Sequence, residues 1–103
     1  MNAAELKEHV RKKKQDREKN IVEFVNVLYN DHVCGMATNE VLDLGISVLY
    51  IEGLIDRELN NCVSIYDFIR NHLIPKFQEN GFYSSWEIGE QFVKVCVWDI
   101  DLE

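Results

Sequence analysis

The segment QFVKVCVWDI, residues 91–100, decides the fold class because its apolar residues follow the two-residue period of a β-strand. Apolar side chains fall on both sides of this run, which is typical of a strand covered on both faces. Residues 82–88 alternate in the same way, and Gly89 lies in a short turn between the two runs. The pattern predicts a C-terminal β-hairpin. An isolated hairpin is marginally stable in water, so this one must pack on helices, gain a third strand, or pair with another chain.

Upstream of the hairpin, residues 64–79 carry the clearest helical pattern of the chain. Ser64 and Asp67 have the spacing of a capping box, and apolar residues then recur on one face. Pro75 lacks a backbone donor and should bend or locally break this helix after Leu73. The pair Asn80-Gly81 predicts its end.

Residues 40–59 fit two interpretations. The helical one follows a period near 3.6 over the whole segment, with a break or bend near Gly53. The strand interpretation has Leu44, Ile46, Val48 and Tyr50 on one face and a turn at residues 52–53. We favour the helix because its period holds over some twenty residues and the alternation over only eight.

The first 29 residues predict one long helix, with Asn2 as its N-cap and Glu5 completing a capping box. Its apolar stripe is interrupted, because residues 11–20 are polar on every face, so this part should be solvated or contact another molecule. The pair Asn30-Asp31 is predicted to end the helix. A connector over residues 31–39 would follow, with Thr38 as the N-cap of the next helix.

Together these segments predict an α+β fold, with three to four helices followed by a C-terminal β-hairpin. At 103 residues the chain is long enough for one compact domain, residues 1–103, and too short for a second. Residues 1–20 are expected to form a basic helical segment that protrudes from it.

Charge is distributed unevenly along the chain. The first 20 residues carry seven basic and four acidic side chains, a net of +3, whereas the remaining 83 carry four basic and 14 acidic ones, a net of −10. Such asymmetry indicates an electrostatically selective partner, because the field of a small domain steers what approaches it.

The sequence also bears on the location and the origin of the protein. The apolar stretches are too short for a membrane span and the amino end does not resemble a signal peptide, so we expect a cytoplasmic protein. The three cysteines have no paired spacing and are expected to be free thiols. Nine Asn, nine Ile and a single Pro are typical of an AT-rich genome and would fit a phage or low-GC bacterial origin.

The acidic residues and the aromatic residues near the carboxyl end form the first candidate binding surface. Scattered carboxylates can mimic the phosphates of DNA or dock on a basic protein, although they also serve solubility. The aromatic residues of the hairpin would act as interface anchors if one of its faces is exposed. The partner-binding residues expected here are Trp86, Glu87, Glu90, Trp98, Asp99, Asp101 and Glu103.

The basic run in the first helix is the alternative. A nucleic acid would be bound through phosphate contacts by Arg11, Lys13, Lys14 and Arg17. Pairs such as Glu8 with Lys12 and Lys14 with Glu18 would partly neutralise that surface, and no aromatic residue interleaves with it to stack a base.

No catalytic or metal-binding motif stands out. A zinc site built from His32, Cys34, Cys62 and His72 would lack the close ligand pairs that such sites usually show. We expect neither enzyme activity, nor a metal, nor a cofactor. The sequence favours a small acidic interaction protein that binds a larger, basic or nucleic-acid-binding protein and regulates or inhibits it; for a phage protein, the target would be a host protein. Self-association through the first helix or the last strand is compatible with this function.

Overall fold

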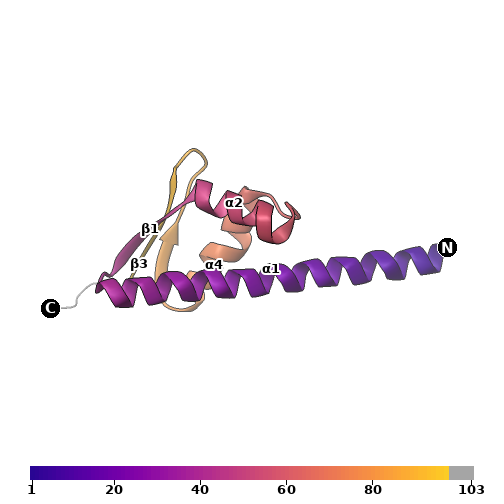
Figure 1. Cartoon of the computed structure of the whole chain (residues 1–103), viewed down its shortest axis with the longest axis horizontal. Coiled ribbons are helices and arrows are strands. Elements are labelled where there is room, and N and C mark those ends of the chain that lie inside the picture. Colours follow the sequence, from indigo (N-terminus) through magenta and orange to yellow (C-terminus); the bar gives the residue numbers. More distant parts are fainter. Residues whose placement is uncertain (98–103) are drawn as a thin grey trace.

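A computed structural model describes residues 1–97 of the chain. Its dominant element is helix α1, Ala3–Asn39, which extends far beyond the other elements and gives the molecule dimensions of 64 × 25 × 22 Å (Figure 1). The Asn2 side chain caps this helix as predicted, accepting a 2.9 Å hydrogen bond from the Glu5 backbone N–H. A 37-residue helix is about 55 Å long.

Residues 43–97 contain a three-stranded antiparallel sheet. Its strands are β1, Asp43–Ser47, β2, Phe82–Ser85, and β3, Phe92–Val97, in the order β1-β3-β2. The predicted hairpin is β2–β3, and β1 supplies the third strand that such a hairpin needs. The fold is therefore α+β, as predicted.

Two further helices pack on one side of this sheet. Helix α2, Val48–Leu59, follows β1 directly, and the Ser47 hydroxyl accepts a 3.4 Å hydrogen bond from the Tyr50 N–H at its start. The third helix is continuous but irregular, with α3, Ile65–Phe68, a π-helical turn η1, Ile69–Leu73, and α4, Ile74–Glu79. The break predicted after Leu73 is displaced: the irregularity is the π-helical turn that ends at Leu73, in the turn before Pro75, which lacks the backbone N–H that would donate to it.

The hydrophobic core lies between the inner face of the sheet, one stripe of α1 and the two shorter helices. Phe68, Ile69, Leu73 and Phe77 of the third helix have no exposed surface. The other buried apolar side chains of this cluster are Ile21, Val25, Leu28, Ile46, Ile51, Ile55, Leu59, Trp86, Val93 and Val95.

The expectation for residues 40–59 was partly wrong. Residues 43–47 form a strand, and only residues 48–59 are helical, without a break at Gly53. Strand β1 forms because it pairs along its whole length with β3, a contact between residues about fifty positions apart that local periodicity does not report. The described residues contain three helices, at the lower end of the predicted number.

The predicted end of the first helix was also wrong. Helix α1 passes through Asn30-Asp31 and Thr38 and ends at Glu40, whose backbone is left-handed with φ of 55°. Helix propensity penalises Asn and Asp by less than about 1 kcal/mol each, and burial of Leu28 and Met36 on either side of this pair outweighs that cost.

Candidate protein-interaction surfaces

Within residues 1–97, the helices cover only one face of the sheet. Val93 and Val95 of β3 are buried, whereas Phe92 and Lys94 point to the other face and are exposed. The expectation of a strand covered on both sides was therefore wrong: the helices lie on the inner face, and no described residue forms a layer over the outer one. We call this uncovered side the outer face.

The outer face carries aromatic side chains. Phe92 is 52% exposed and Tyr83 is 43% exposed. The Phe92 side chain lies against Gly45 of the neighbouring strand, since a Cβ on that glycine would sit 3.5 Å from the Cβ of Phe92. Beside them is a shallow hollow of about 550 Å³, lined by Asp43, Leu44, Gly45, Tyr83, Lys94, Val95 and Cys96.

Trp86, expected to bind a partner, is instead part of the core. It is only 7% exposed, and its indole Nε1 donates a 2.9 Å hydrogen bond to the Glu90 carbonyl oxygen. Its ring contacts that of Tyr66 edge-on, with centroids 6.0 Å apart. In this arrangement Trp86 anchors the β2–β3 loop and presents little surface to another molecule.

The two acidic residues of that loop hold its tip together. The Glu87 N–H donates to Glu90 Oε1 over 3.2 Å, and the Glu90 carboxylate lies 3.7 Å from Lys94 Nζ. Glu87 is exposed, so the loop places negative charge beside the outer face. The remaining residues predicted for this surface, Trp98, Asp99, Asp101 and Glu103, lie outside the described residues.

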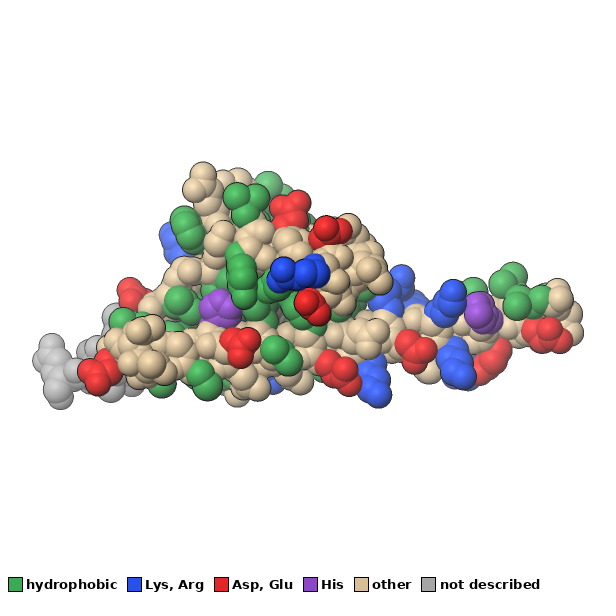
Figure 2. Space-filling model, in the orientation of Figure 1, with side chains coloured by type: hydrophobic (Ala, Val, Ile, Leu, Met, Phe, Trp, Pro, Cys, Tyr) green, Lys and Arg blue, Asp and Glu red, His purple; other side chains and the backbone are tan. Residues whose placement is uncertain are grey.

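The basic residues lie on the part of α1 that extends beyond the body. Residues 1–20 are all exposed, and Ile21 is the first buried residue of the helix. We call residues 3–20 of α1 the overhang. Figure 2 shows side chains of both charges along it. Glu8 was predicted to pair with Lys12, but in the structure it forms an ion pair with Arg11.

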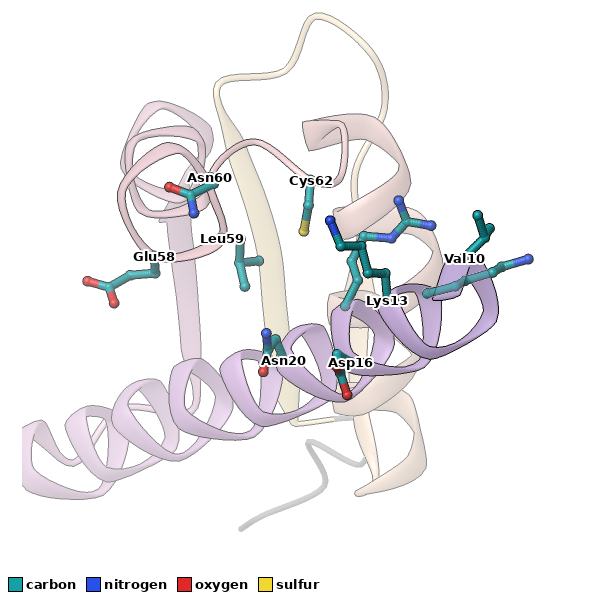
Figure 3. A pocket seen from close by; sticks show the side chains of 10 residues that line it. Val10, Lys13, Asp16, Asn20, Glu58, Leu59, Asn60 and Cys62 are labelled. Atoms are coloured by element: carbon teal, nitrogen blue, oxygen red, sulfur yellow. The ribbon is translucent and has the colours of Figure 1, made fainter. Parts of the chain in front are cut away.

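Lys13, Lys14 and Arg17 come together at a hollow where the overhang meets the body. This hollow, of about 750 Å³, lies between α1 and the turn that joins α2 to α3. Figure 3 shows Lys13 and Asn20 rising from α1 on the side where Leu59 and Cys62 point down from the body. Asp16 and Glu58 also line it, so its charge is mixed.

A second hollow continues the first along α1. It is formed by α1 and α2, has a volume of about 600 Å³, and shares Asn20, Glu58 and Leu59 with the first. Its apolar wall consists of Phe24, Val27, Leu28, Tyr50 and Leu54, and its acidic rim of Glu23, Asp31 and Glu58. We call the two hollows together the α1 groove. This groove was not predicted, although the interrupted apolar stripe of the first helix marks part of its lining.

The residues of the discarded zinc site do not converge. Within residues 1–97 no group of three or more potential ligands is placed to hold a metal ion. His32 Nδ1 lies 2.7 Å from the Leu28 carbonyl oxygen, a backbone contact within its own helix. Cys34 is exposed on α1, and the cysteines are free thiols as predicted.

Across the described part of the chain, no helix combines the length and the apolar character needed to cross a membrane. No family model, curated protein sequence or solved structure matches this chain.

Proposed function

We propose that this is a non-enzymatic cytoplasmic interaction protein that binds a larger protein through the outer face of its sheet and regulates or inhibits it. The observation that carries the proposal is that two aromatic side chains, Phe92 and Tyr83, are exposed on a sheet face over which residues 1–97 form no layer. Half-exposed aromatic side chains on a rigid strand lose little conformational entropy on binding, and such residues dominate binding energy at interfaces.

Charge supports a basic partner. The chain outside its first 20 residues has a net charge of −10. Near the outer face, Asp43 lies at one end of β1 and Glu87 in the β2–β3 loop, and both are exposed, whereas Lys94 on that face lies 3.7 Å from the Glu90 carboxylate. A partner with an apolar centre and a cationic rim would complement this arrangement. Complementary charge of this kind raises association rates and excludes wrong partners more than it raises affinity.

The test uses Phe92→Ala and a control on another surface. A partner is first isolated from cells of the source with the intact protein and then titrated, as a purified protein, against each variant. We expect Phe92→Ala to weaken binding about 30-fold, corresponding to about 2 kcal/mol for a hot-spot aromatic residue. Val22→Ala is the matched control, because Val22 is 53% exposed but lies on α1. Equal affinity of Phe92→Ala and the intact protein would contradict the proposal.

A nucleic-acid-binding accessory protein is the second candidate, favoured by the convergence of Lys13, Lys14 and Arg17 on one hollow. Binding to a labelled DNA duplex should then fall with salt by a logarithmic slope of about −0.9 per phosphate contact. Charge reversal of Lys13, Lys14 and Arg17 to Glu would abolish that binding, and Phe92→Ala would leave it unchanged. If the outer face mediates the function, Phe92→Ala should weaken binding of the protein partner and charge reversal of Lys13, Lys14 and Arg17 should leave that binding unchanged.

A further inference from the structure

Apart from Asn20, the overhang lines only the first hollow of the α1 groove, because one straight helix cannot fold back onto its own residues 23–31, which line the second hollow. The overhang exposes two large apolar side chains, Leu6 at 53% and Val10 at 54%. The groove exposes Val27 at 59% and Tyr50 at 52%. Helices without tertiary contacts are marginally stable in water, so a partner along this face would stabilise the overhang.

A single seam runs along α1 from the overhang into the groove. Its residues recur in alternating steps of four and three, the spacing that keeps side chains on one face of a helix that packs against another helix. The seam consists of Leu6, Val10, Lys13, Arg17, Asn20, Phe24, Val27 and Asp31. From Val10 onward every one of these residues lines the α1 groove.

The charge along the seam changes sign from one end to the other. At its amino-terminal end α1 contributes Lys13, Lys14 and Arg17 to the groove lining together with one carboxylate, Asp16, a net positive charge; at the other end it contributes Glu23 and Asp31. Two such helices packed in parallel would place like charges together. Packed antiparallel about a two-fold axis, the basic end of each helix lies against the acidic end of the other, and the contact is made twice.

We propose that two copies of this chain pair through antiparallel α1 helices, with the overhang of each copy lying in the α1 groove of the other. The seam has the same sequence of steps in both directions, so antiparallel pairing places Val10 opposite Val27 and Lys13 opposite Phe24. Valine meets valine, and the aliphatic stem of a lysine covers an aromatic ring while its ammonium group reaches solvent. Tyr50 and Leu54 of α2 form the second wall against the incoming helix.

This pairing goes beyond the proposed function and uses a different surface. The seam lies on α1, whereas the proposed partner surface lies on the outer face of the sheet, which the pairing leaves uncovered. A dimer would therefore present two outer faces and could bind a repeated or dimeric target with increased avidity.

Molecular mass in solution tests the pairing directly. Sedimentation equilibrium of the full chain should give twice the 12.1 kDa chain mass at micromolar concentration. Val10→Asp and Val27→Asp should each raise the dimer dissociation constant at least about 100-fold, because an ionised carboxylate would be buried in the seam. Val22→Asp is the matched control, since Val22 is equally exposed on α1 but lies opposite the seam, and it should remain dimeric.

Zero-length carbodiimide crosslinking tests the antiparallel register. Lys14 and Glu23 are about 13.5 Å apart along a straight helix, too far for a direct amide bond within one copy. A Lys14–Glu23 crosslink between isotopically distinct copies is therefore expected. A monomeric mass up to 100-fold above micromolar concentration would overturn the proposal, as would a Val10→Asp variant that stays dimeric. Circular dichroism and thermal melting of each variant separate loss of pairing from loss of folding, and Phe92→Ala should leave the dimer mass unchanged.

Discussion

Replacing Ser84 by alanine should make the protein more stable. Ser84 lies on the inner face of β2, is 3% exposed, and its hydroxyl has no hydrogen-bond partner among the described residues. A buried hydroxyl without a partner costs about 1–3 kcal/mol, and Ser84→Ala removes that cost. The vacated space, on the order of 15 Å³, costs about 0.4 kcal/mol at ~24 cal/mol per Å³. The free energy of unfolding should therefore rise by about 1 kcal/mol.

Thermal unfolding followed by circular dichroism measures this change. For a domain near 100 residues, about 1 kcal/mol corresponds to an increase in Tm of about 4–8 °C. Ser85→Ala is the matched control on the same strand, because Ser85 points to the outer face and is partly exposed; it should change stability by less than about 0.5 kcal/mol. Variants are compared at equal protein concentration, since pairing would raise Tm by mass action. A lower Tm for Ser84→Ala, or an equal rise for Ser85→Ala, would refute the reasoning.

Two further predictions concern backbone conformation and the hairpin loop. Gly53 is exposed within α2 and a Cβ there would meet nothing within 4 Å, so Gly53→Ala should stabilise the protein by up to about 1 kcal/mol. Gly81 has φ of +87°, so Gly81→Ala should destabilise it by about 1–2 kcal/mol. The free energy of unfolding measured in urea should therefore rise for Gly53→Ala and fall for Gly81→Ala. Trp86→Phe removes the 2.9 Å hydrogen bond to the Glu90 carbonyl oxygen and should lower the free energy of unfolding by about 1–3 kcal/mol. An unchanged free energy of unfolding in urea would show that this bond does not anchor the loop.

Local sequence signals predicted the elements that depend on nearby residues. Asn2 and Ser64 cap their helices as expected, each accepting from the backbone N–H three residues on, and Pro75 follows the irregular turn by two residues. Capping and proline effects act within one turn of helix, so a few residues determine them. These features are accessible without knowledge of the tertiary structure.

The errors arise where distant contacts decide the outcome. Strand β1 forms because Ile46 pairs with Val93 and is buried with it, although the surrounding periodicity favours a helix. Likewise, α1 continues past Asn30 because Met36 is buried at its far end. In both cases burial of one or two apolar side chains, at about 1.5–3 kcal/mol each, exceeds the local propensity that favoured the alternative.

The candidate surfaces were only partly accessible from sequence. The aromatic residues of the hairpin were expected to anchor an interface if one of its faces is exposed, but the alternation did not show which face the helices cover, and Trp86 proved to be buried. The stripe of α1 was visible as apolar residues interrupted by Lys13, Lys14 and Arg17. The structure shows that these basic residues line a groove, and that the groove continues along α1 to a rim of acidic residues.

The position of the charges argues that the complement of the overhang comes from another molecule. Electrostatic interactions between exposed groups decay over about 8 Å at physiological ionic strength. Lys7 lies about 21 Å along the helix from Ile21, the first buried residue of α1, so the acidic body of the same chain does not neutralise this end of the overhang. Arg11 forms a local ion pair with Glu8. A second copy would place the acidic end of its own α1 groove beside these basic residues. A nucleic acid would place phosphates there instead. The two would therefore compete for the same seam. Duplex DNA should therefore dissociate the dimer if both proposals for α1 hold, and should leave its mass unchanged if the seam serves pairing alone.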